Sequence, residues 1–156
     1  MTDLTYGVCD RSKLVSQSGL EFLSAIANGR LPQPPICRTM GFALTDVGDG
    51  RVVFEGATHD GLGNPIGSVH GGFAATLLDS ATACAVHTIV PKGRVYTTLE
   101  LKVNFVRALL ADTGAVRAEG TVVHRGRTVA TSEARLTDAT GRLYAHATST
   151  CMIMDG

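Results

Sequence analysis

The sequence predicts an α+β domain in which an antiparallel sheet of five to six strands curls around one long apolar helix. The stretch from about Gly71 to Val90 is apolar on nearly every face and too long for a strand, which indicates a helix buried within its own protein. The carboxy-terminal half is rich in β-branched residues, and turn residues recur there at regular spacing. Strands joined by such short turns are antiparallel neighbours, so the sheet can pack one face against the helix.

The first 35 residues predict an arm and one short helix. Residues 1 to about 13 are polar and unpatterned, which is typical of a loosely held segment. Ser18-Gly-Leu-Glu21 matches a capping box, and apolar residues then recur at helical spacing until Gly29. The proline-rich run 31–35 disfavours both a helix and a central strand. We therefore expect an arm with a short amphipathic helix over 1–35 and the main domain over 36–156.

The remaining sequence predicts the strands. We expect them, in order, at about 40–45, 51–57, 96–107, 115–124, 128–137 and 142–153. The first two flank Gly48-Asp49-Gly50, which is a hairpin turn signal. Strict alternation over the third places two groups on opposite faces: Thr97, Leu99, Leu101, Val103 and Phe105 on one, and Thr98, Glu100, Lys102 and Asn104 on the other.

Composition excludes several classes of function. The 156 residues include 14 basic and 14 acidic side chains, so the chain offers no overall positive field for nucleic acid or an anionic membrane. The four cysteines are far apart and form no metal-ligand spacing, which predicts reduced thiols and no metal site. The amino terminus lacks the charged and apolar regions of a secretory signal, so we expect a cytoplasmic protein.

Asp79 is the residue that most needs an explanation. A carboxylate in the middle of an apolar helix costs several kcal/mol to desolvate unless it is compensated. Helical spacing surrounds it with a strip of small side chains that resembles a cavity wall: Gly72, Ala75, Thr76, Thr82 and Ala83. Asp79 is therefore either a structural acid paired with a backbone group or an arginine, or a catalytic group.

The start of the same helix carries the complementary chemistry. Gly71 and Gly72 lack Cβ atoms, so their N–H groups, at the positive end of the helix dipole, can meet a carbonyl oxygen closely. Gly71 and Asp79 are, however, eight residues apart, or roughly 12 Å along a helix. Because both must lie near the reacting atoms, we expect a two-fold dimer in which Gly71 of one chain meets Asp79 of the other.

The string Asn64-x5-His70-Gly71-Gly72-x6-Asp79, on a loop and helix followed by four strands, resembles the hotdog-fold thioesterases. The resemblance is to the phenylacetate-degradation (PaaI-like) branch, which includes one type of 4-hydroxybenzoyl-CoA thioesterase. The segments 94–107 and 123–130 also resemble that family, and the similarity covers about residues 36–154.

The resemblance implies an acyl-CoA thioesterase that acts on aromatic or medium-chain acyl groups and needs no metal or organic cofactor. Asp79 would be the general base or the nucleophile, with Gly71 N–H as the oxyanion donor. His70 would orient that end of the site, Asn64 would position the water or the thioester, and Thr98 would assist the water.

The resemblance also implies where coenzyme A binds and how the chains assemble. Gly72 would contact the substrate, and basic side chains would meet the phosphates: Arg107, Arg125, Arg127 or Lys102. The family forms homodimers and commonly homotetramers. Two other functions stay open, a hotdog hydratase or dehydratase and a non-catalytic acyl-CoA-binding protein. The hydratases' Phe-Pro-Gly-rich loop is missing, and the chain has no basic helix-turn-helix segment for DNA binding.

Overall fold

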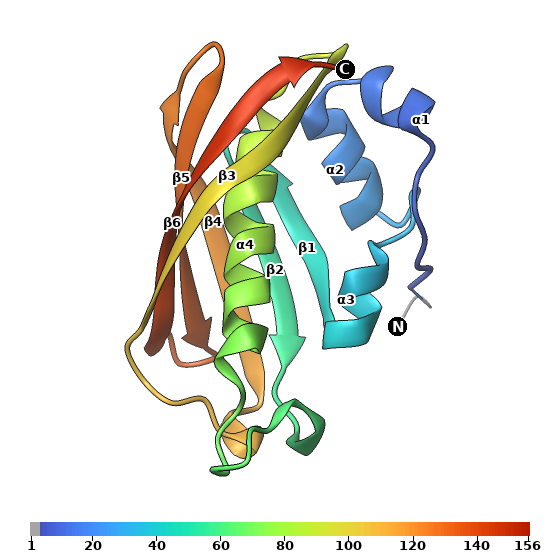
Figure 1. Cartoon of the computed structure of the whole chain (residues 1–156). Coiled ribbons are helices and arrows are strands. Elements are labelled where there is room, and N and C mark those ends of the chain that lie inside the picture. The colour runs from blue at the N-terminus through green and yellow to red at the C-terminus, as the bar shows by residue number, and fades with distance from the viewer. Residues whose placement is uncertain (1–3) are drawn as a thin grey trace.

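The computed structural model describes residues 4–156 as one antiparallel sheet curled around a central helix (Figure 1). The sheet has six strands in the order β1-β2-β4-β5-β6-β3, and the helix α4 spans Gly71–Thr88. The strands are β1 Phe42–Gly48, β2 Arg51–Ala57, β3 Arg94–Phe105, β4 Ala115–Arg125, β5 Val129–Asp138 and β6 Leu143–Asp155. A sheet wrapped around one long helix is the hotdog fold, so the predicted fold class is confirmed.

The helix α4 is held by close packing against the middle of the sheet. Phe73, Leu77, Leu78 and Ala81 are almost completely buried, as the sequence predicted. A Cβ atom on Gly120 of β4 would lie 2.1 Å from the carbonyl oxygen of Ala81, so this glycine lets the helix backbone approach the strand directly. None of the helices in residues 4–156 combines the length and apolarity needed to cross a membrane.

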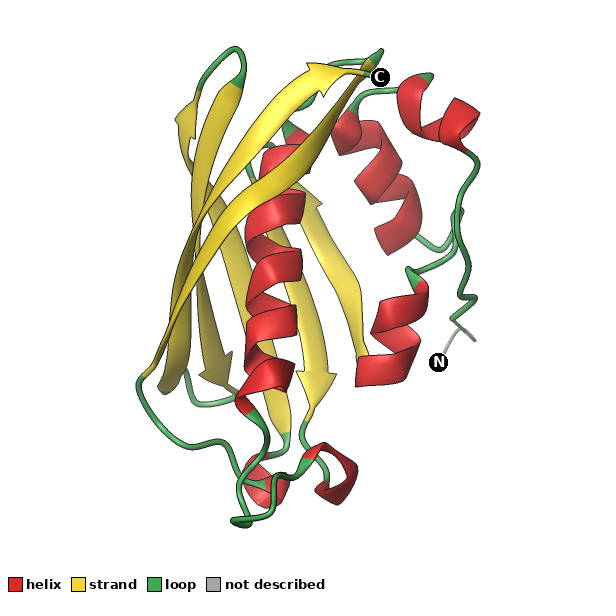
Figure 2. Ribbon diagram, viewed as in Figure 1, coloured by secondary structure: helices red, strands yellow, loops and turns green. Residues whose placement is uncertain are grey.

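Three short helices precede the sheet: the second and third pack against β1, and the first packs against the second (Figure 2). The predicted one is α2, Gly19–Ala27, and its capping box is present: Ser18 N–H donates to Glu21 Oε2 at 2.8 Å. The helices α1, Arg11–Val15, and α3, Pro35–Met40, were not predicted. Placing a strand start at Met40 was wrong, because Pro35 occupies the first turn of α3, where a proline needs no N–H partner.

The expectation of a loosely held arm over residues 1–13 also needs correction. Residues 1–3 lie outside the described residues, but Thr5 to Gly7 pair with Gln33 through two backbone hydrogen bonds of 2.8 and 3.0 Å. The buried Gln33 side chain in turn bonds both the N–H and the C=O of Leu44 in β1, each at 3.0 Å. The arm is thereby fixed to the edge of the sheet, through contacts between residues far apart in sequence.

A β-bulge in β3 overturns the predicted two-residue alternation. Thr98 pairs with Cys151 of β6, but the next paired residue is Glu100, which leaves Leu99 as an extra residue. Cys151 is completely buried, so Thr98 faces the helix, whereas Leu99 is 56% exposed. The bulge changes the phase of the strand, and Thr98 joins the same face as the residues that the sequence placed opposite to it: Leu101, Val103 and Phe105.

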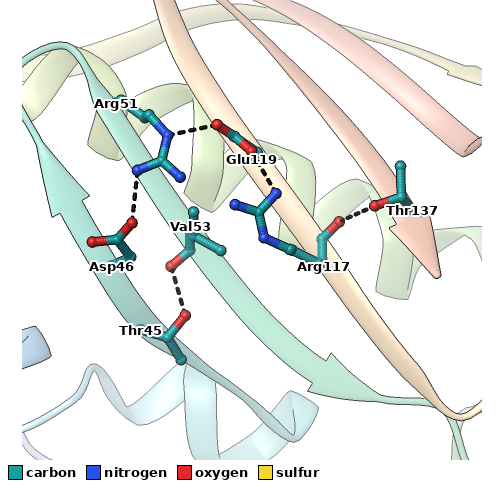
Figure 3. A network of polar contacts seen from close by, with 7 residues as sticks. All are labelled: Thr45, Asp46, Arg51, Val53, Arg117, Glu119 and Thr137. Carbon is teal, nitrogen blue, oxygen red and sulfur yellow. Dashed lines mark hydrogen bonds and ion pairs between the residues drawn. The ribbon is translucent and has the colours of Figure 1, made fainter. Parts of the chain in front are cut away.

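The outer face of the sheet carries charged side chains that pair with one another (Figure 3). Arg51 of β2 bonds Asp46 at 2.7 Å and Glu119 of β4 at 2.5 Å, and Arg117 bonds the same Glu119. Arg117 and Glu119 alternate along β4 with buried residues that face α4. Arg51 and Arg117 are therefore already partnered and lie on the face turned away from the central helix.

Candidate active site

A cavity of about 290 Å³ lies at the amino-terminal end of α4. Two loops form its sides, and they are joined by a hydrogen bond from Val69 N–H to the carbonyl oxygen of Leu109, at 2.9 Å. Four predicted site residues line it: Asn64, His70, Gly71 and Arg107. The other lining residues are Ser68, Val69, Ala74, Phe105, Val106, Ala108, Leu109, Tyr144 and Ala145.

His70 caps the helix and leaves one backbone donor unused. Its Nδ1 accepts a hydrogen bond from Gly72 N–H at 2.8 Å, and its carbonyl oxygen accepts from Phe73 N–H at 3.0 Å. Within residues 4–156, Gly71 N–H has no hydrogen-bond partner. A free N–H at the positive end of a helix, in the wall of a cavity, is suited to hold a developing oxyanion.

Both glycines are packed so that a side chain would meet a neighbour. A Cβ atom on Gly71 would lie 3.2 Å from the ring of Phe105, and one on Gly72 would lie 2.8 Å from His70 Nδ1. The second contact would compete with the bond that caps the helix. Glycine at position 72 therefore keeps the cap in place, and glycine at position 71 avoids a close contact with the Phe105 ring.

Asn64 organises the loop that forms one side of the cavity. Its Oδ1 accepts a hydrogen bond from Ile66 N–H at 3.0 Å, and its Nδ2 donates to Ser68 Oγ at 3.0 Å. The side chain thus makes the Asx turn expected before a proline. In this structure it positions the loop, with no hydrogen bond to the other predicted site residues.

Asp79 is half-buried and unpaired. Within the described part of the chain its carboxylate makes no hydrogen bond or ion pair, which disfavours the reading as a paired structural acid. Burial raises the pKa of Asp79 above that of an ordinary aspartate, which makes it a stronger base. Asp79 does not line the cavity at Gly71, so one chain does not bring the two residues together.

Thr98 lies beside the buried thiol of Cys151. Thr98 Oγ1 is 3.9 Å from Cys151 Sγ. The pKa of Cys151 is raised mainly by burial, and the negative charge of Asp79 contributes to that shift. Asp79 also contributes to the raised pKa values of Cys84 and Tyr96, after burial, the main cause in each case. Sequence reasoning assigned no site role to these three residues.

The predicted arginines separate into two groups. Arg107 lines the cavity and donates from Nη1 to the carbonyl oxygen of Leu143 at 2.9 Å. Arg125 pairs with Asp49 at 2.7 Å, and the Arg127 carbonyl oxygen accepts from Arg94. Arg125 and Arg127 lie at the turn between β4 and β5, which is at the far end of the sheet from the start of α4 (Figure 1). Eighteen residues of helix span about 27 Å, so a single chain does not bring these groups together.

Lys102, the fourth basic candidate, is exposed on β3, where it pairs with Thr148. It lies on the opposite face of the strand from Thr98.

Comparison with known proteins gives this geometry a context. The model of the thioesterase superfamily matches residues 66–145, which include Gly71 and Asp79. A candidate esterase of Halobacterium salinarum is 36% identical over 92 residues, which cover 53% of this chain and 61% of that protein's length. The 1,4-dihydroxy-2-naphthoyl-CoA hydrolase of Listeria monocytogenes is 25% identical over 105 residues, 67% of this chain and 84% of that enzyme.

Solved structures agree with the same assignment. A candidate thioesterase of Ralstonia eutropha JMP134, a phenylacetic acid degradation-related protein, is 32% identical and superimposes with a TM-score of 0.75 over 84% of this chain and 98% of its own. A thioesterase family protein of Silicibacter pomeroyi is 26% identical, with a TM-score of 0.74 over 86% of this chain and 99% of its own. The chain therefore belongs to the thioesterase superfamily, and its resemblance to the phenylacetic acid degradation branch is confirmed.

Proposed function

We propose that this protein is an acyl-CoA thioesterase whose active site combines Gly71 of one chain with Asp79 of a second. One observation carries the proposal. The start of α4 offers an unused N–H in the wall of a cavity, and the middle of the same helix offers an unpaired carboxylate about 12 Å away. Each group has the chemistry that thioester hydrolysis needs, and they must come from different chains to meet at one carbonyl.

The reaction follows from the two groups. The thioester oxygen accepts a hydrogen bond from Gly71 N–H, and a water molecule attacks the carbonyl carbon while Asp79 takes its proton. When the C–S bond breaks, the proton passes to the coenzyme A sulfur and the free acid remains. In the alternative route Asp79 attacks the carbonyl itself, and water then hydrolyses the resulting anhydride. Neither route uses a metal or an organic cofactor.

The free edge of the sheet supports a two-fold pairing. β3 ends the strand order and is twelve residues long, whereas the other edge, β1, is met by Gln33. Leu99 and Phe105 of β3 are 56% and 60% exposed. Gly72, Thr76 and Asp79 of α4 are half-buried, and β3 is one of the strands in contact with that helix. Pairing two copies along β3 would satisfy the edge and bring these residues of the two helices together.

The other predicted residues take supporting roles in this proposal. His70 holds the helix start and leaves Gly71 N–H as the free donor, while Asn64 shapes the loop. Thr98 would orient the attacking water beside Asp79. Arg107 stands nearest the cavity, and Arg125 and Arg127 could reach coenzyme A only from a partner chain. We further propose that the dimers pair into tetramers and that the protein acts in the cytoplasm.

The acyl group is proposed to be aromatic or of medium length. The Listeria relative acts on an aromatic acyl-CoA, which supports the first of these. A panel of aromatic and straight-chain acyl-CoA thioesters, with detection of the released thiol, identifies the preferred group.

Complementation between two inactive chains tests the composite site. Gly71→Pro removes the oxyanion donor and Asp79→Asn removes the base, so each variant alone should be nearly inactive. A mixed dimer, purified through a different tag on each chain, would contain one site with both groups intact and one with neither. We expect it to recover about half of the wild-type kcat. A mixed dimer no more active than its parents would show that one chain supplies the whole site.

A further inference from the structure

Tyr144 lies in the wall of the cavity, at the start of β6. Its side chain is buried, at 7% exposure, and it lines the cavity together with Ala145. The Tyr144 carbonyl oxygen accepts hydrogen bonds from Val106 N–H at 2.8 Å and Arg107 N–H at 3.0 Å. The backbone of Tyr144 is therefore attached to the loop at 106–107, which also lines the cavity.

The hydroxyl end of Tyr144 is held as well. It donates a hydrogen bond to Asp138 Oδ2 at 3.2 Å. The other oxygen of Asp138 accepts from Thr140 N–H at 2.9 Å, from Thr140 Oγ1 at 2.7 Å and from Arg142 N–H at 3.0 Å. The bonds from Thr140 are the main reason that the pKa of Asp138 is lowered. A charged acceptor with a fixed position thus restrains the ring at its far end.

The size of the cavity limits what can enter it. A water-sized group occupies about 30 Å³, and protein interiors are filled to a density of about 0.74. A cavity of about 290 Å³ therefore accommodates roughly seven to ten such groups. That number corresponds to a ring with one carbonyl, or to a straight chain of about eight carbons.

The walls indicate which part of a thioester enters. Five of the lining residues are less than 9% exposed, and four of these are aliphatic: Val69, Ala74, Leu109 and Ala145. The more exposed part of the lining includes the polar residues Asn64, Ser68, His70 and Arg107. The pantetheine arm of coenzyme A carries two amides, which would lose hydrogen bonds to water against the buried, aliphatic part of the lining. An acyl group loses none, and burial of its apolar surface is favourable.

We propose that Tyr144, positioned by Asp138, is the floor of the acyl pocket and sets the longest acyl group that the enzyme accepts. This inference rests on the proposed thioesterase function. Removal of the ring extends the cavity in line with the acyl chain, whereas loss of the hydroxyl alone leaves the floor in place. The length preference, rather than the overall rate, is the property that Tyr144 controls.

The test compares kcat/KM over straight-chain acyl-CoA thioesters from hexanoyl to dodecanoyl. In Tyr144→Ala the optimum should move to longer chains, and the ratio of dodecanoyl to hexanoyl turnover should rise at least about tenfold, since each methylene in an apolar pocket is worth about 10-fold or more. Tyr144→Phe should keep the wild-type optimum. Asp138→Ala should broaden the profile, and Asp138→Asn should restore much of it.

Two controls keep the outcomes distinct. Phe42→Ala removes a buried ring from β1 that does not line the cavity. If loss of stability alone does not change the length preference, this variant should keep the wild-type preference. Tyr144→Leu serves as a second variant with a smaller change in the core. An unchanged length profile in folded Tyr144→Ala or Tyr144→Leu overturns the inference, as does an equal rise in KM for all lengths, which would place the pantetheine arm in the cavity. Absence of hydrolysis by the wild-type protein across the panel would instead overturn the proposed function.

Discussion

Gly71→Pro is the sharpest single test of the oxyanion role, because it removes the N–H group at a position where the helix tolerates proline. Gly71 is the first residue of α4, a position where proline is well tolerated since its N–H has no partner within the helix. His70 precedes it with φ −62° and ψ 134°, the extended conformation that a following proline requires. The substitution is therefore expected to leave the helix intact.

The magnitude follows from the number of donors. Gly72 N–H bonds His70 Nδ1 and Phe73 N–H bonds the His70 carbonyl, so Gly71 supplies the free donor of the first turn in the described structure. Loss of one oxyanion donor costs about 2.7 to 4 kcal/mol of transition-state stabilisation, which lowers kcat by about 10²- to 10³-fold. KM should change little, because the bond strengthens as negative charge develops on the oxygen.

Gly71→Ala is the matched control. It places a Cβ at the same distance of 3.2 Å from the Phe105 ring but keeps the N–H group. We expect kcat of the alanine variant to stay within a few-fold of wild type, measured by release of coenzyme A thiol. A folded proline variant with wild-type kcat would refute the oxyanion role, and an equal loss in both variants would assign the effect to the Phe105 contact instead.

Three further predictions concern stability. Burial raises the pKa of Asp79, so its ionisation opposes folding as the pH rises through that pKa. The Asp79→Asn variant should therefore melt at a higher temperature than the wild-type protein at pH 7. The difference in melting temperature should shrink below about pH 4, where the carboxyl group is protonated in the folded and the unfolded protein. Burial between Phe22 and Tyr96 lowers the pKa of His87 to about 4, so as the pH falls the unfolded chain binds a proton at this histidine before the folded chain does. The melting temperature of the wild-type protein should therefore fall between about pH 6.5 and pH 4. His87→Phe should flatten that part of the curve of melting temperature against pH. Parallel curves for the two proteins would contradict this. Gln33→Leu leaves the N–H and C=O of Leu44 without partners, which should cost roughly 2 to 4 kcal/mol in urea unfolding and speed hydrogen exchange at the Leu44 amide. Unchanged exchange there would show that Gln33 does not seal the β1 edge.

Local patterns in the sequence determined much of this protein. The apolar run after Gly71 predicted α4, the capping box at Ser18 predicted α2, and the β-branched segments with their turns predicted the strands. Each of these signals depends on neighbours within a few residues, because burial in a helix or strand repeats with that element's own period. The motif around His70 and Asp79 likewise identified the family from the chain alone.

Tertiary contacts decided the rest. The bulge that turns Thr98 towards α4 depends on its register with β6, some fifty residues away in the chain. The amino-terminal arm is ordered by Gln33 and the edge of β1. The cavity that Tyr144 lines exists only because two loops far apart in sequence meet there. Residues that come together through folding leave no periodic trace along the sequence, whereas residues that repeat on one face of one element do.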